Sequence, residues 1–128
     1  MSADPARRGF PKSARLLRRV EFRRVYDEGQ RRNGPNFAVF FRPNGLKETR
    51  LGITVPVRVG KAVLRNRVKR RLREVFRLNR DRFSRGWDIV LNPREAAGRV
   101  PLLSLEREMM RLFPSQSPSA ASGESKRQ

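Results

Sequence analysis

Residues 61–80 read KAVLRNRVKRRLREVFRLNR, a pattern that predicts one long α-helix from Lys61 to Arg80. Apolar residues recur along it at helical spacing and form one stripe, which comprises Leu64, Val68, Leu72, Val75 and Phe76. At about 100° per residue, a largely separate arc carries Asn66, Lys69, Arg70, Arg73 and Arg77. Glu74 is the only acidic residue in the stretch, whereas a solvated helix usually mixes charges of both signs. The helix is therefore expected to pack by its apolar stripe and to present a cationic surface.

Two strands are predicted before this helix and one after it. Residues 36–42 (NFAVFFR) are aromatic and β-branched, and residues 50–55 (RLGITV) alternate between apolar and other residues. Pro43, Asn44 and Gly45 favour a turn between the two, so we expect these strands to pair antiparallel. Residues 87–92 (WDIVLN) predict the third strand.

A helix is predicted at each end of this arrangement. In Val20–Glu28, the residues Phe22, Val25 and Tyr26 share one face, and Gly29 is a candidate for the C′ stop. Ser104 is a candidate cap for a last helix that runs to Phe113 and faces inward with Leu105, Met109, Leu112 and Phe113. The elements predict an α+β fold, a two-layer sandwich in which helices pack on a small mixed sheet.

The 128 residues suggest one domain, for which we expect residues 10–113. Residues 1–9 are interpreted as a disordered basic tail, and residues 114–128, which are rich in Ser and Pro, as a second disordered tail. We expect truncation at Phe113 to leave the function intact.

The net charge of +19, from 31 Lys and Arg against 12 Asp and Glu, favours a polyanionic partner over a membrane or an acidic protein. The absence of Cys and His excludes disulfides, thiol nucleophiles and histidine bases, and a cytoplasmic location is expected. The sequence has no apolar run of transmembrane length. The sequence contains neither a glycine-rich loop that could bind phosphate nor a group of carboxylates that could converge on one site. We therefore expect no catalytic site and no metal site in the protein.

The aromatic residues offer a second feature besides charge. Most of them are expected in the core, but Phe40 and Phe41 are neighbours on one strand and must point to opposite faces of the sheet. An exposed ring beside cations is a platform for unpaired bases, and Ala38 and Thr54 could leave such a surface low and open. Asn66 can both donate and accept; from the sequence alone, it serves equally well as a cap of the local backbone or as a reader of a polar group.

The segment VGKAVLRNRVKRRLREVFR, residues 59–77, resembles the arginine-rich RNR signature of the bacterial ribonuclease P protein family. Three other stretches resemble landmarks of that family in the same order: EFRRVYDEG at 21–29, RLGITV at 50–55 and GWDIV at 86–90. The resemblance covers about residues 10–113.

The resemblance implies a subunit of ribonuclease P, the endoribonuclease that removes the 5′ leader from precursor tRNA. It implies a left-handed βαβ crossover, hydrolysis by an RNA subunit with bound Mg²⁺, and no catalytic residue in the protein. The implied partners are ribonuclease P RNA, at one protein per RNA, and precursor tRNA, with no membrane.

The resemblance also assigns residues to two surfaces. An RNA-binding set is implied around the RNR motif: Arg65, Asn66, Arg67, Lys69, Arg70, Arg73 and Arg77. A cleft for the leader is implied at Phe22, Tyr26, Phe40, Lys69 and Arg73. One departure stands before the motif, where Pro56-Val57-Arg58 replaces the Ser-Lys-Lys of many members; one cation is missing, and Pro56 should stiffen or end the strand.

Two other classes of protein have similar composition. A ribosomal protein would bind ribosomal RNA without any effect on tRNA cleavage. A small basic DNA-binding protein would show a helix-turn-helix or a dimer signature, and neither is present in the sequence.

Overall fold

The computed structural model describes residues 12–118. Three α-helices and one four-stranded sheet form its framework, linked by short 3₁₀ turns. In chain order the main elements are α2 (Arg19–Glu28), β1 (Gln30–Asn33), β2 (Phe37–Pro43), β3 (Arg50–Ile53), α3 (Ala62–Asn79), β4 (Trp87–Pro93) and α4 (Leu102–Leu112). The predicted α+β class with a mixed sheet and packed helices is confirmed.

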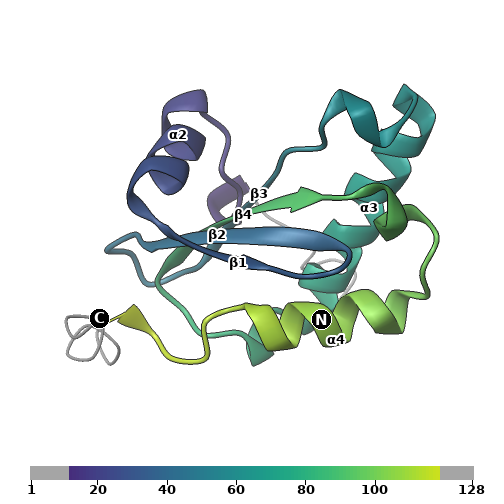
Figure 1. Ribbon diagram of the computed structural model, residues 1–128. Coiled ribbons are helices and arrows are strands. Elements are labelled where there is room, and N and C mark those ends of the chain that lie inside the picture. The colour runs from purple at the N-terminus through teal and green to yellow at the C-terminus, as the bar shows by residue number, and fades with distance from the viewer. Residues whose placement is uncertain (1–11, 119–128) are drawn as a thin grey trace.

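The sheet has the order β1-β2-β4-β3, so β4 lies between the two strands that the sequence predicted as a pair. The antiparallel pairing expected between residues 36–42 and 50–55 is therefore wrong. β2 pairs antiparallel with β4 over seven residues, from Phe37↔Pro93 to Pro43↔Trp87, and β3 pairs parallel with β4 over four. α3 is the crossover that joins this parallel pair (Figure 1).

β4 takes the central place because its residues are buried on both faces of the sheet. Its side chains from Trp87 to Leu91 are all buried, whereas β3 has only four residues with a mixed burial pattern. A strand flanked on both sides and covered on both faces is rich in apolar residues. The two polar residues of β4, Asp88 and Asn92, have hydrogen-bond partners in Arg50 and Tyr26. Seven pairs with β2 also bury more backbone than the four that β3 can offer.

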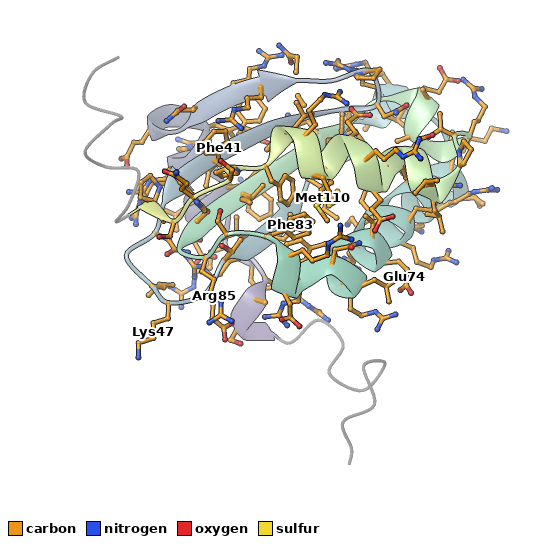
Figure 2. The ribbon with its side chains drawn as sticks, turned by 90° about the horizontal axis from the view of Figure 1, so that it is seen from below. Phe41, Lys47, Glu74, Phe83, Arg85 and Met110 are labelled. Atoms are coloured by element: carbon orange, nitrogen blue, oxygen red, sulfur yellow. The ribbon has the colours of Figure 1, made fainter. Side chains whose placement is uncertain are left out.

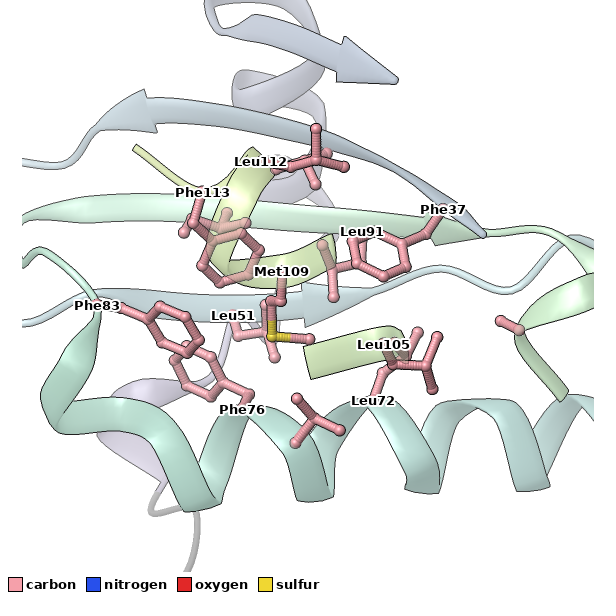
Figure 3. Close-up of a cluster of buried hydrophobic side chains, with 14 of the residues drawn as sticks. Phe37, Leu51, Leu72, Phe76, Phe83, Leu91, Leu105, Met109, Leu112 and Phe113 are labelled. Carbon is pink, nitrogen blue, oxygen red and sulfur yellow. The ribbon is translucent and has the colours of Figure 1, made fainter. Parts of the chain in front are cut away.

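The main core lies between the sheet and the pair α3 and α4 (Figure 3). Alternate residues of the strands enter it, including Phe37 and Phe41 of β2 and Leu91 of β4. From the helices come the residues that the sequence predicted, Leu72 and Phe76 among them, with Leu105, Met109, Leu112 and Phe113 all buried. Phe76 stacks on Phe83 with ring centroids 5.6 Å apart and an interplanar angle of 7°.

α2 lies on the opposite face of the sheet (Figure 1). It contacts β2 and β4 through a smaller cluster of Leu16, Val25 and Val90, against which Phe22, Tyr26 and Phe40 pack. Phe40 and Phe41 therefore do point to opposite faces, as their adjacency predicted.

Strand β1 was missed in the sequence. Its residues, QRRN, are all exposed and carry no apolar alternation, so no local pattern marks a strand. It forms because β2 offers a free edge, on which Gln30 pairs with Phe41 and Asn33 with Ala38.

Gly29 ends α2, as the sequence predicted, but as its C-cap with an extended backbone rather than as the C′ residue. Its φ is −93°, and its N–H donates to the carbonyl of Val25 at 2.9 Å. A Cβ at this position would lie 2.6 Å from the Phe41 carbonyl oxygen and 2.5 Å from that of Val25. Glycine is needed here because the backbone of α2 approaches β2 closely.

Two boundaries near the C-terminus differ from the prediction. The last helix begins at Leu102 with Pro101 as its N-cap, so Ser104 lies inside it. The predicted disordered tail begins too early, because residues 114–118 contact the fold. Ser84 Oγ donates to the carbonyl of Pro114 at 2.7 Å, and Trp87 Nε1 donates to that of Gln116 at 3.0 Å. The predicted tail 1–9 and residues 119–128 lie outside the described residues.

Candidate nucleic-acid interface

Three aromatic side chains gather on the α2 face of the sheet, and we call Phe22, Tyr26 and Phe40 the aromatic platform. All three are partly exposed, and each packs against the small cluster beneath α2. The rings of Tyr26 and Phe40 meet edge to face, with centroids 4.8 Å apart and an interplanar angle of 82°. The structure thus brings together the three predicted cleft aromatics from two elements that are distant in sequence.

The sheet beneath the platform is low and holds the rings in place. Tyr26 donates its hydroxyl hydrogen to Asn92 Oδ1 at 2.8 Å, a contact from α2 to β4. Gly52 lies under Phe22, since a Cβ there would be 2.5 Å from the Phe22 ring. Of the two residues predicted to leave this surface low and open, Ala38 is buried and Thr54 is exposed, so only Thr54 is open to solvent. Asn92 was missed because only the fold places it opposite Tyr26.

A polar clasp fixes α2 to the sheet and consists of Glu21, Arg50 and Asp88. Glu21 Oε1 accepts hydrogen bonds from the N–H groups of Leu17 and Arg18 at 3.0 and 3.1 Å, which caps α2. Its other oxygen accepts from Arg50 Nη1 at 3.1 Å. Arg50 also forms a bidentate pair with Asp88, with both contacts at 2.8 Å. Because Asp88 is only 3% exposed, the clasp rests on a buried carboxylate.

The clasp shifts the pKa values of its members. The hydrogen bond to Asp88 is the largest cause that raises the pKa of Arg50 above its ordinary value, with smaller contributions from the charges of Asp88 and Glu21. Desolvation raises the pKa of Glu21, but the backbone donors at Arg18 and Leu17 and the charge of Arg50 together outweigh it. The net pKa of Glu21 is lowered, so the ionised form is favoured in the folded state.

The cationic arc and the other residues of the RNA-binding set, Arg65 and Arg67, all lie on α3. Asn66, Arg67, Arg70 and Arg73 are exposed, whereas Arg65 and Lys69 are half-buried. Arg65 Nε donates to the carbonyl of Gly60 at 3.0 Å and so braces the loop before the helix. In that loop Gly60 has a φ of +152°, which favours glycine. Asn66 does not cap the helix, because α3 begins at Ala62 after Lys61.

Arg77 stands apart from the other predicted residues. It lies about 16 Å along the helix from Asn66, and its Nη2 pairs with Glu74 Oε2 at 2.6 Å. It lines a cavity of about 270 Å³ at the C-terminal end of α3, together with Glu48, Thr49 and Arg80. Figure 2 shows Glu74 on this part of α3. The structure therefore does not bring Arg77 together with the platform.

Residues 15 and 16 connect the arc to the platform. Arg15 forms a parallel bridge with Leu51 at the edge of the sheet, and Leu16 belongs to the cluster under the aromatic rings. Partial burial lowers the pKa of Arg73, and the charge of Arg15 lowers it further. The charges of Arg73 and Arg15 therefore interact, and Arg15 lies beside β3 through its bridge to Leu51. Sequence reasoning missed Arg15, because only the bridge to β3 brings it there.

The departure at Pro56-Val57-Arg58 forms a 3₁₀ turn, Val57–Val59, with Pro56 at its N-cap. β3 ends at Ile53, so the strand is shorter than predicted. Val57 is 76% exposed, which leaves an apolar side chain next to Arg58 at this edge of the arc.

Within residues 12–118, no group of three His, Cys, Asp or Glu side chains could hold a metal ion. None of the helices in this part of the chain is long and apolar enough to cross a membrane.

The sequence matches the family model described as Ribonuclease P over residues 10–115. The chain belongs to the ribonuclease P protein family. It is 41% identical over 104 residues to the ribonuclease P protein component of Desulfosudis oleivorans, covering 81% of this chain and 86% of that one. It is 38% identical over 108 residues to the component of Thermotoga maritima, covering 81% and 92%.

Solved structures of the family share the fold. The ribonuclease P protein from Thermotoga maritima superposes with a TM-score of 0.72 at 37% identity, covering 77% of this chain and 94% of that one. The Staphylococcus aureus protein gives a TM-score of 0.70 at 29% identity, covering 79% and 93%. The chain is thus a protein subunit of ribonuclease P, an endoribonuclease that processes tRNA. Family membership also decides against the ribosomal and DNA-binding alternatives.

Proposed function

We propose that the aromatic platform and the adjacent cations of α3 bind the single-stranded 5′ leader of precursor tRNA. The observation that carries the proposal is the group of three partly exposed rings on the α2 face of the sheet. Arg15, which bridges to Leu51 of the edge strand β3 and whose charge acts on Arg73, supports a cationic border beside these rings. Unpaired bases stack on aromatic rings, while cations beside them neutralise phosphates. Lys69 and Arg73, one helical turn apart, would follow the backbone of the leader.

The rest of the arc would face the ribonuclease P RNA. Arg65, Asn66, Arg67 and Arg70 lie in the first half of α3, and the three of them that are exposed leave their polar groups open to solvent. Binding there would release counterions from the RNA, which makes the affinity large and dependent on salt. Arg77 is the weakest member of the predicted set, since Glu74 already neutralises it.

In this proposal the RNA subunit carries out hydrolysis with Mg²⁺, which it holds together with the substrate, and the protein has no catalytic residue. The protein would raise affinity for precursor over mature tRNA, because mature tRNA has no leader. Its cations would also screen phosphates near the site and so lower the Mg²⁺ concentration that the reaction needs. One protein per RNA is expected, acting in the cytoplasm where precursor tRNA is made.

The test is a binding comparison with the reconstituted holoenzyme. We expect the wild-type protein to bind precursor tRNA more tightly than mature tRNA. The double substitution Lys69→Ala/Arg73→Ala should reduce that ratio about tenfold or more, because two phosphate contacts are lost. Arg107→Ala/Arg111→Ala is the matched control, since both residues are exposed on α4. An equal loss in both double variants would show a general effect of charge and contradict the proposal.

A further inference from the structure

Arg31, which belongs to neither predicted set, covers one ring of the aromatic platform. It lies on β1 and is the register partner of Phe40 on β2, so both side chains project from the same face of the sheet. The guanidinium carbon is 5.3 Å from the centroid of the Phe40 ring. Arg31 itself is exposed, so its guanidinium forms the outer layer over Phe40.

Neighbouring residues hold this guanidinium but do not neutralise it. Arg31 Nε donates to Asn33 Oδ1 at 3.2 Å, and Arg94 Nη2 donates to the same oxygen at 3.4 Å. Two guanidiniums thus converge on one amide oxygen. Among residues 12–118, no carboxylate forms an ion pair with Arg31 or with Arg94.

Arg32, the next residue of β1, also lies over an aromatic ring but has a structural role. Arg32 points to the other face, where its guanidinium carbon lies 4.7 Å from the Phe41 centroid. Its Nη1 donates to the carbonyls of Leu112 and Phe113 at the end of α4, at 2.9 and 3.4 Å. Arg32 therefore ties the end of α4 to the sheet. The terminal nitrogens of Arg31 make no such bond to the described residues, which leaves them available to a ligand.

A guanidinium held over a ring offers two properties to a nucleotide. Its plane stacks on a base, and its free N–H groups attract phosphate. An ammonium in its place would keep the charge but would lose the stacking plane.

We propose that Arg31 is a further leader-contacting residue, whose guanidinium stacks on the base of the nucleotide that reaches Phe40. The inference rests on the proposed function, since it assumes that the leader crosses the platform. The leader would then meet a stacking layer that continues from Phe40 through Arg31, at the end of the sheet away from α3 and the β3 edge.

The experiment combines leaders that contain one abasic nucleotide with variants of Arg31 in the reconstituted holoenzyme. An abasic nucleotide removes the base and keeps the phosphate. With the wild-type protein, we expect one abasic position to weaken precursor binding about 5- to 150-fold through lost contact with Arg31, the range for one stacked base. In Arg31→Lys the penalty at that position should fall below about twofold, because charge remains without a plane. Arg107→Ala, on the opposite face, should keep the wild-type profile.

The outcomes separate this inference from the proposed function. If Arg31→Lys keeps the full wild-type abasic profile, charge alone explains the residue and the stacking role is overturned. If the wild-type holoenzyme binds precursor and mature tRNA equally, the proposed function fails and the inference fails with it. Leader discrimination in the wild type with a flattened profile in Arg31→Lys supports both.

Discussion

The two faces of the sheet differ in how completely they are covered. Toward α3 and α4, Phe37, Phe41 and Leu91 are at most 1% exposed within a continuous core. On the other face α2 covers only part of the surface, and the three rings of the platform stay partly exposed beside polar groups such as Asn92. Because neighbouring residues of a strand serve different faces, one strand can supply stability to one side and recognition to the other.

The largest effect is expected from the covered face. Phe76→Ala removes a buried ring that stacks on Phe83, and we expect a loss of about 4 kcal/mol in the free energy of unfolding. Urea unfolding followed by the fluorescence of the single tryptophan, Trp87, measures it. The folded fraction should still discriminate precursor from mature tRNA. A loss of stability below about 1 kcal/mol would contradict the assignment of the core.

A somewhat smaller loss is expected when the clasp on the open face is broken. Arg50→Met leaves the buried Asp88 carboxylate without its bidentate partner, which should cost about 3 kcal/mol. α2 should also detach more easily, since Arg50 is its link from Glu21 to the sheet. Hydrogen exchange of the α2 amides would then rise more than that of α4. Uniform acceleration of both helices would argue against a local role.

Gly52→Ala is expected to affect recognition more than stability. The added methyl group would enter the space of the Phe22 ring, a side chain that can move aside. We expect affinity for precursor tRNA to fall about tenfold, the cost of one displaced stacking contact. Affinity for ribonuclease P RNA, measured separately, should stay within about twofold if the cations of α3 supply it. A matched loss of both affinities would show that the two surfaces are not separate.

The smallest expected effect is the pH dependence of stability that Glu21 causes on the α2 face of the sheet. The pKa of Glu21 is lowered in the folded protein from an ordinary value of 4.5. Its contribution to stability is therefore present above pH 4.5 and is lost as the pH falls through the folded pKa. The melting temperatures of wild type and Glu21→Gln should differ at pH 7 and converge as the pH falls below the folded pKa of Glu21. A difference that stays constant with pH would rule out this linkage.

Elements with strong periodicity could be predicted from the sequence. α3 was predicted within one residue at each end, and the inward-facing residues of the last helix are all buried. β1 could not be predicted, because its polar residues form a strand only on the free edge of β2. The order of the strands could not be predicted from local patterns either, because β4, which follows β3 and α3 in the chain, lies between β2 and β3 in the sheet.

The candidate site also contains residues that local spacing predicts and residues that only the fold brings together. Phe22 and Tyr26 could be grouped by helical spacing, and Phe40 by its alternation with Phe41. Arg15, Arg31 and Asn92 reach the platform through pairings between strands, so no spacing in the sequence points to them. Arg77 keeps the helical spacing of the arc, but the sequence alone did not predict its ion pair with Glu74.

The most direct test of the account is a reconstituted cleavage reaction. The chain is combined with a bacterial ribonuclease P RNA and 5′-labelled precursor tRNA, at an Mg²⁺ concentration too low for the RNA alone. We expect cleavage at the mature 5′ end that requires the RNA and is lost in Lys69→Ala/Arg73→Ala, whereas Arg107→Ala/Arg111→Ala remains active. Tight RNA binding with no gain in cleavage, using RNA from a close source, would contradict the claim that the open face recruits the leader.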